Sequence, residues 1–428
     1  MKGAFLFLFL LVGLGAGAQV DGSDGAIVRE MKGLVAGADF FRLERMLGQY
    51  SDSISTADRL YFQSYVDNGF NRNRASIYRI DSFTHLDIHE RTDTAEAQLL
   101  QLLMDNYGKL FAYRKAGEIS DYILHAYSGV LDSSERNDVA NTGRIWHALE
   151  DVAPQSMAPH GDVLMPMRRD ILGLWNIPVS SGDSMDDFIF DTGANLSTIS
   201  ESEAKKMGVR HLHSMINVGS SQGMVVQAEM GVADSLQVGA LVVRHVVFLI
   251  FPDDMLYFKP VHFGIKGIIG YPVIAAMRQV HISAGDTLMV PAVPAKSDLH
   301  NLEMNGNTPV FYMAVNNNDT LDFRFDSGAS ESELYNRYYE RYKAWVHEYG
   351  HKVRTKMGGA GGVRKSKDYA VDDFVFKVGH RAGVIHSANV QTKPLGDVDR
   401  VAYGNIGQDV IKALGGVTLN FEGMWIEF

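Results

Sequence analysis

Cysteine is absent from this chain of 428 residues, and that absence excludes several kinds of chemistry at once. Without a thiol there is no disulfide, no thiolate zinc site, no cysteine nucleophile and no lipid-anchored N-terminal cysteine. Burial of apolar side chains must therefore hold the fold together. With 46% hydrophobic residues, the chain is long enough to build two or three domains, each with its own core.

Basic residues are also too few to favour polyanionic partners, since the net charge is -11. Nucleic acids and anionic membranes attract basic patches, so we expect neither as a partner. Long apolar runs are lacking as well. The run from Ala4 to Val12 is far shorter than the roughly 20 residues that cross a bilayer, and no later segment supplies a membrane span.

That short apolar run does fit a secretory signal peptide. It follows Met1 and Lys2 and precedes the small residues Ala16-Gly-Ala18. We therefore predict that residues 1–18 are a signal peptide and that the mature protein begins near Gln19. An exported protein without disulfides suits the periplasm or the exterior of a bacterium.

Proline is missing from Asp24 to Val152, and this stretch has apolar residues three and four positions apart. The spacing predicts several short helices in succession, which resemble an array of helical hairpins without a fixed period. We expect residues 19–155 to form an all-helical N-terminal domain. It would pack against the rest of the chain or bind a protein partner.

The remainder changes to β-branched runs and Gly turns, and it contains an internal duplication. Asp191-Thr-Gly-Ala194 follows one predicted strand, and Asp326-Ser-Gly-Ala329 follows another. Downstream, Gly267-Ile-Ile-Gly270 corresponds to Gly404-Asn-Ile-Gly407 at a nearly equal interval. We therefore expect two similar β lobes, residues 156–298 and residues 299–428.

In these motifs the sequence resembles the aspartic peptidases, over about residues 160 to 428. It is similar to the retropepsin-like kind, but with both halves fused in one chain as in pepsin-like enzymes. The resemblance implies a mainly β fold of two pseudo-symmetric lobes. It also implies that Asp191 and Asp326 form the catalytic pair of an aspartic endopeptidase that needs no cofactor and cleaves a peptide or protein substrate.

The same resemblance assigns roles to the neighbouring residues. The hydroxyls of Thr192 and Ser327 would tie the two loops together, and Gly193 and Gly328 would permit close approach of the backbone. A Gly-rich hairpin tip would form a flap over the substrate. The candidates are Ser220, Ser221 and Gly223 within Val218–Met224, with Gly358–Gly362 as the counterpart in the second lobe.

Two carboxyl groups in contact cannot both ionise easily, so the pair would share one proton. The ionised carboxylate would remove a proton from a water molecule held between Asp191 and Asp326, while the protonated one would polarise the scissile carbonyl. An extended substrate would lie between the lobes, bonded through its main chain.

Two other interpretations stay open. His347-Glu-Tyr-Gly-His351 fits the pattern in which two His bind zinc and Glu348 acts as the base of a metallopeptidase. That site needs both His on one helical face and a third ligand, whereas we expect the helix to end at Gly350. The chain would also fit a module that keeps the peptidase fold and binds peptides without cleaving them.

Overall fold

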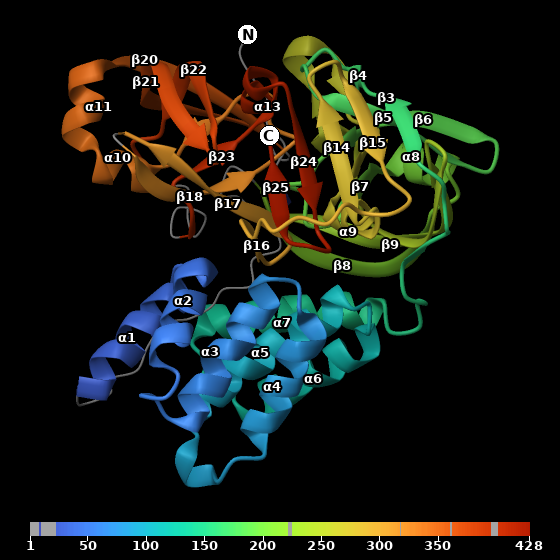
Figure 1. Cartoon of the computed structure of the whole chain (residues 1–428). Coiled ribbons are helices and arrows are strands. Elements are labelled where there is room, and N and C mark those ends of the chain that lie inside the picture. Colours follow the sequence, from blue (N-terminus) through green and yellow to red (C-terminus); the bar gives the residue numbers. More distant parts are fainter. Residues whose placement is uncertain (1–7, 10–22, 221–224, 317, 360–361, 395–400) are drawn as a thin grey trace. The chain divides into compact units, whose positions relative to one another are not determined.

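The structure of the protein is a computed structural model that describes residues 8–9, 23–220, 225–316, 318–359, 362–394 and 401–428. The chain is mainly β, with an all-α region at its N-terminal side (Figure 1). It divides into two compact units. The helical unit contains Leu11–Pro154 and Glu303–Gly306, and the β unit contains Met1–Leu10, Gln155–Leu302 and Asn307–Phe428.

The helical unit is built from consecutive short helices. They are α1 (Ser23–Ala36), α2 (Phe40–Tyr50), α3 (Thr56–Gly69), α4 (Asn73–Thr84), α5 (Asp93–Lys109), α6 (Tyr113–Ala126) and α7 (Ser133–Ala148), with a 3₁₀ turn η1 (Ile88–Glu90) before α5. Among the helices in the described part of the chain, none combines the length and the apolar character that a bilayer crossing requires.

Three of the connections between these helices share one turn geometry. Ala38, Asn71 and Phe111 each lie two residues after a helix and each have a positive φ, of 51°, 55° and 57°. A single left-handed residue ends a helix and reverses the chain within a short loop. These turns join α1 to α2, α3 to α4 and α5 to α6.

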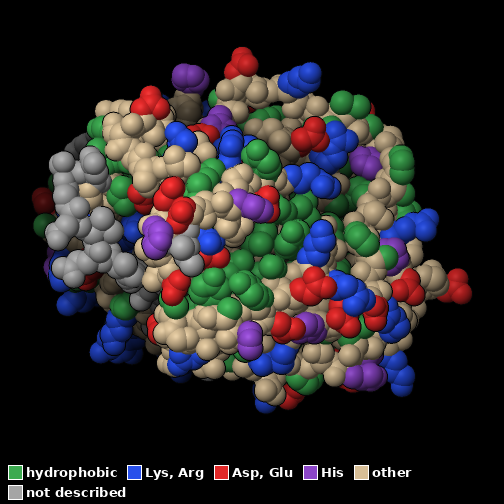
Figure 2. All heavy atoms as spheres, turned by 90° about the horizontal axis from the view of Figure 1, so that it is seen from below, with side chains coloured by type: hydrophobic (Ala, Val, Ile, Leu, Met, Phe, Trp, Pro, Cys, Tyr) green, Lys and Arg blue, Asp and Glu red, His purple; other side chains and the backbone are tan. Residues whose placement is uncertain are grey.

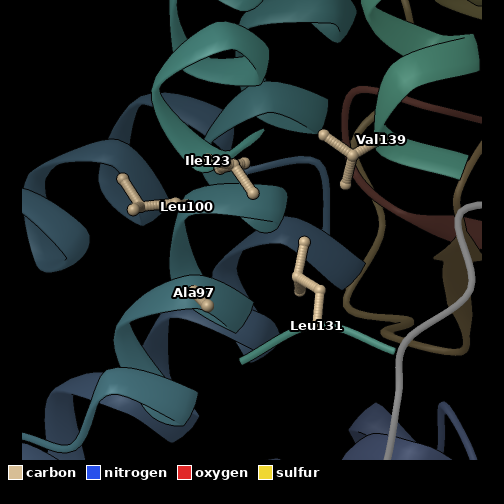
Figure 3. Close-up of a cluster of buried hydrophobic side chains, with 5 residues drawn as sticks. All are labelled: Ala97, Leu100, Ile123, Leu131 and Val139. Atoms are coloured by element: carbon tan, nitrogen blue, oxygen red, sulfur yellow. The ribbon is translucent and has the colours of Figure 1, made fainter. Parts of the chain in front are cut away.

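A cluster of apolar side chains holds the last helices together (Figure 3). Its members come from α5, α6, the loop before α7, and α7 itself: Ala97, Leu100, Ile123, Leu131 and Val139. Truncating a buried Leu or Ile of this kind to Ala typically costs about 2–5 kcal/mol. The helical unit thus has an apolar core of its own.

The first half of the β unit forms one large sheet, which runs in the order β8-β9-β10-β7-β13-β6-β5-β4. The bounds of these strands are β4 (Arg168–Arg169), β5 (Trp175–Ser181), β6 (Ser184–Phe190), β7 (Ser197–Ser200), β8 (Arg210–Ser220), β9 (Val225–Val238), β10 (Leu241–Phe251) and β13 (Gly267–Ile269). The short strands β1 (Leu8–Phe9) and β2 (Ser156–Met157) pair with β8 and β10.

Shorter elements connect these strands. They are α8 (Glu201–Lys206), the 3₁₀ turns η2 (Asp253–Leu256) and η3 (Lys259–Val261), the paired strands β11 (Tyr257–Phe258) and β12 (Phe263–Gly264), and α9 (Tyr271–Ala276).

The second half of the β unit forms a sheet in the order β17-β18-β23-β19-β22-β21-β20. Its strands are β17 (Thr308–Val315), β18 (Asp319–Phe325), β19 (Glu333–Leu334), β20 (Gly350–Gly359), β21 (Gly362–Val378), β22 (Arg381–Val390) and β23 (Gly404–Ile406). The helices are α10 (Asn336–Arg341), α11 (Lys343–Tyr349) and α13 (Gln408–Leu414), and the short strand β16 (Leu302–Asn305) precedes the sheet.

A third sheet joins the two halves of the β unit, in the order β25-β24-β14-β15-β3. Its strands are β3 (Val163–Pro166), β14 (Gln279–Ser283), β15 (Thr287–Val290), β24 (Gly416–Asn420) and β25 (Trp425–Glu427). The central pair joins Val280 of the first half to Leu419 of the second. Main-chain hydrogen bonds therefore link the two halves through strands that are distant in sequence from the Asp-Thr-Gly and Asp-Ser-Gly loops.

The two halves pair their central strands in the same way. In the first, β13 runs parallel to β6 and antiparallel to β7. In the second, β23 runs parallel to β18 and antiparallel to β19. Large aromatic side chains, including Phe188 and Phe190 on β6 and Phe323 and Phe325 on β18, are fully buried beside these strands. The strands that carry the two Asp loops are thus anchored in apolar cores.

Candidate active site

Asp191 and Asp326 occupy equivalent places at the ends of β6 and β18. The main-chain N–H of Asp191 donates to the carbonyl of Ile269 at 3.1 Å, and that of Asp326 donates to Ile406 at 2.9 Å. Both acceptors are the last residues of the short strands β13 and β23. Each Asp is therefore held by the short strand, β13 or β23, of its own half.

Reciprocal hydrogen bonds tie the two loops together. The N–H of Thr192 donates to Ser327 Oγ at 3.0 Å, and the N–H of Ser327 donates to Thr192 Oγ1 at 3.0 Å. Each hydroxyl then donates across to the other loop, Thr192 Oγ1 to the carbonyl of Phe325 at 3.3 Å and Ser327 Oγ to that of Phe190 at 2.9 Å. Because both hydroxyls are fully buried, water does not compete for these bonds.

The two glycines lie directly against the carboxyl groups. The N–H of Gly193 donates to Asp191 Oδ1 at 2.8 Å, and that of Gly328 donates to Asp326 Oδ1 at 2.8 Å. A Cβ at Gly193 would lie 2.8 Å from Cγ of Asp326, and one at Gly328 would lie 2.3 Å from Cγ of Asp191. Only glycine lets each loop approach the opposite carboxyl so closely.

Both carboxyl groups are buried, with 1% of each residue exposed. Burial raises the pKa of Asp191 well above its ordinary value, and repulsion from the charge of Asp326 raises that pKa further. Burial also raises the pKa of Asp326, but hydrogen bonds from Asp191 and Asn405 and the positive charge of Arg324 act against this rise. The pair can therefore hold one proton at a pH where an ordinary Asp is ionised.

Asn405 and Arg324 were not among the residues singled out from the sequence. Asn405 Nδ2 donates to Asp326 Oδ2 at 3.0 Å, and Arg324 lies opposite Asn405 in the parallel pair of β18 and β23. The signal was visible in the duplication itself, because Asn405 interrupts the match between Gly404-Asn-Ile-Gly407 and Gly267-Ile-Ile-Gly270. A polar residue at an apolar position of a repeated motif indicates a local function.

The two flap candidates adjoin long pairs of antiparallel strands. Strands β8 and β9 pair as far as Gly219 and Val225, which lie in and directly after the first candidate segment. Ser220 is the last residue of β8, whereas Ser221 and Gly223 lie outside the described residues. In the second half, β20 and β21 pair as far as Gly359 and Gly362.

The residues of the alternative zinc motif do not share a helix. His347 and Glu348 lie in α11, which ends at Tyr349, and His351 lies in β20, so the expected end of the helix at Gly350 is confirmed. The helix that carries His347 is short, because Tyr342 separates α10 from α11.

The two imidazoles also have different neighbours. His347 Nε2 lies 2.9 Å from the hydroxyl of Tyr339, and His351 Nδ1 lies 3.6 Å from a carboxylate oxygen of Asp372. Within the described ranges, no three His, Asp or Glu side chains are grouped as metal ligands. The arrangement that the zinc motif requires, with both imidazoles on one helical face, is not formed.

Two loops that each carry an Asp are therefore tied by reciprocal hydroxyl bonds around a buried pair of carboxyls. Residues 177–273, which include Asp191 but not Asp326, match the family model described as Aspartyl protease. The resemblance drawn from the duplicated motifs is thereby confirmed, and the match supports a peptidase.

Among solved structures, the chain is similar to a retropepsin-like aspartic protease from Rickettsia conorii. The two share 15% identity with a TM-score of 0.23, over 32% of this chain and 92% of that one. The search of curated proteins found no match.

Proposed function

We propose that the protein is an aspartic endopeptidase in which a water molecule held between Asp191 and Asp326 attacks the scissile peptide bond. The observation that supports it most is the shared environment of the two carboxyls. Each lies against the glycine of the opposite loop, and burial raises the pKa of both. Such a pair can supply a base and an acid at the same time.

In this reaction the ionised carboxylate takes a proton from the water molecule, while the oxygen of that water bonds to the carbonyl carbon of the substrate. The protonated carboxyl donates to the carbonyl oxygen and stabilises the charge that develops there. Breakdown of the tetrahedral intermediate then returns a proton to the leaving nitrogen. The main-chain bonds of Asp191 and Asp326 to β13 and β23 hold both carboxyls in place throughout.

The duplicated loops also support two lobes related by a pseudo-two-fold axis. The same pairing around β13 and β23, and the exchange of hydroxyl bonds between Thr192 and Ser327, fit that symmetry. A peptide would lie extended between the lobes under the hairpins β8–β9 and β20–β21. It would add main-chain hydrogen bonds there, as extended peptides do at sheet edges.

We infer further that the protein is exported and that the helical unit binds a protein partner or restricts access of substrates. The apolar N-terminal run supports export.

The helical unit exposes the aromatic residues Tyr78 and Tyr122, which are 65% and 48% exposed. Figure 2 shows one face of the molecule with apolar side chains in its middle and charges of both signs around them. N-terminal sequencing of the secreted protein is expected to begin near Gln19.

The experiment that tests the function compares peptide cleavage by the wild type, Asp191→Asn, Asp326→Asn and Glu348→Gln, from acid to neutral pH and with and without a chelator. Asn can neither carry the charge nor share the proton, so either Asp change should abolish turnover while Glu348→Gln and the chelator have little effect. The reverse pattern would establish the zinc mechanism. Peptide binding without cleavage at any pH would identify a non-catalytic module.

A further inference from the structure

A buried polar pair in the second lobe replaces an apolar pair in the first. Ile189 on β6 lies opposite Ile268 on β13 in parallel register. At the corresponding positions, Arg324 on β18 lies opposite Asn405 on β23. All four are buried, and Arg324 and Asn405 are only 3% and 1% exposed. Burying an amide and a guanidinium costs free energy, so their presence beside one Asp and not the other needs a physical explanation.

The hydrogen bonds to the two carboxyls differ because Asn405 has an N–H donor and Ile268, at the corresponding position, has none in its side chain. Asp326 accepts at both oxygens, from the N–H of Gly328 at Oδ1 and from Asn405 Nδ2 at Oδ2. Asp191 accepts at Oδ1 from the N–H of Gly193. Its other oxygen, Oδ2, is buried and meets no donor group within the described residues.

An ionised carboxylate only accepts hydrogen bonds, whereas a protonated one also donates. An oxygen that receives a bond from a fixed N–H is suited to carry negative charge. A buried oxygen that receives none is suited to carry the proton and donate it to its neighbour. The geometry therefore distributes the shared proton unequally between Asp191 and Asp326.

We propose that Asn405 is a positioning residue that makes Asp326 the ionised base of the dyad and leaves the proton on Asp191. This inference rests on the function proposed above. In the proposed reaction, Asp326 takes the proton from the attacking water, and Asp191 donates its proton to the carbonyl oxygen of the substrate. Arg324, on the strand that precedes Asp326, adds a positive charge that favours the same arrangement.

The charges around Asp326 agree with this assignment. Charged side chains on β18, on the loop that carries Asp326, on β19 and on α13 are Asp319, Asp322, Arg324, Glu331, Glu333, Asp409 and Lys412, and Asp191 lies on the opposite loop. Burial raises the pKa of Asp326, and among the surrounding groups Asp191, Asn405 and Arg324 lower it by hydrogen bonding or by charge. For Asp191, the charge of Asp326 instead adds to the effect of burial.

The first test is the pH profile of kcat/KM for peptide cleavage by Asn405→Leu, which keeps the branched shape of the side chain but removes the N–H donor. A hydrogen bond to a charged group corresponds to about one to two pKa units, so the acid limb of the profile should move up by about one to two pH units. Ile268→Leu at the equivalent position of the first lobe is the matched control, and its acid limb should not move. An unmoved acid limb in Asn405→Leu would overturn the proposal, even if the rate fell.

The second test does not depend on turnover or on the folding of Asn405→Leu. The carboxyl that remains in Asp191→Asn and the one that remains in Asp326→Asn are titrated by NMR with ¹³C-labelled aspartate, and the double variant identifies their signals. We expect the carboxyl of Asp326 to titrate at the lower pH. The opposite order would refute the assignment. If the wild type cleaves no peptide, the proposed function fails, but this order still decides where the proton lies.

Discussion

Removal of the Thr192 hydroxyl should loosen the link between the two Asp loops. Thr192→Val keeps the shape of the side chain but loses the bond to the carbonyl of Phe325 at 3.3 Å. It also leaves the buried N–H of Ser327 without its acceptor at 3.0 Å. An unsatisfied buried donor costs about 1–3 kcal/mol, and the longer bond contributes about 0.5–1 kcal/mol. We therefore expect the free energy of unfolding of the β unit to fall by about 1.5–4 kcal/mol.

Thr192→Ser is the matched control, because it keeps the hydroxyl and should cost much less. Ser327→Ala removes the partner hydroxyl, and the double variant Thr192→Val/Ser327→Ala should cost less than the two single changes added together. Residues in one hydrogen-bond network couple by about 0.5–3 kcal/mol.

Urea unfolding gives the free energies, and amide hydrogen exchange of the segments that contain Thr192 and Ser327 localises the effect to the two loops. Exchange is needed because the chain divides into two compact units, and the urea curve of such a protein need not be two-state. A change in the free energy of unfolding below about 0.5 kcal/mol for Thr192→Val would refute the stabilising role of the Thr192 hydroxyl. Equal destabilisation by Thr192→Ser would refute it as well.

Two further predictions concern the carboxyls themselves. Gly328→Ala places a Cβ 2.3 Å from Cγ of Asp191, so we expect loss of cleavage and a destabilisation of about 1–3 kcal/mol in urea unfolding. Normal cleavage would contradict the close approach of Gly328 to the Asp191 carboxyl. Because the pKa of Asp191 is raised above its ordinary value of 3.8, the folded state binds more protons than the unfolded state above that pH, and stability falls as pH rises. Asp191→Asn should therefore unfold at a higher urea concentration than the wild type at pH 7, and this gain in stability should disappear near pH 3.8. An equal gain in stability at both pH values would contradict the raised pKa.

The duplicated motifs gave the centre of the candidate site from the sequence. Asp191 and Asp326 each follow a strand in both copies, and the matched Gly-rich elements downstream required a common local fold. The helical region was also predictable, since apolar periodicity without Pro leaves few alternatives. In both cases the signal is local, because spacing along the chain decides which face of an element is apolar.

Features that depend on contacts distant in sequence were not predictable in the same way. The bond from Asn405 to Asp326 requires knowing that β23 runs beside β18. The sheet formed by β14 and β24 joins segments that the duplication treats as separate copies. The zinc motif shows the converse, because His347 and His351 have suitable spacing but belong to a helix and to a strand.

We propose that Asp191 and Asp326 activate water together to cleave a peptide bond. The most direct measurement is kcat for peptide cleavage by Asp326→Asn relative to the wild type. Asp187→Asn on β6 serves as a control for the same substitution outside the dyad. General acid–base catalysis contributes about 10²–10⁴-fold in rate, so we predict a loss of at least about 10²-fold in Asp326→Asn, with folding preserved and with Asp187→Asn active. Full activity of a folded Asp326→Asn would contradict the claim, because Asp326-Ser-Gly would then be only a turn.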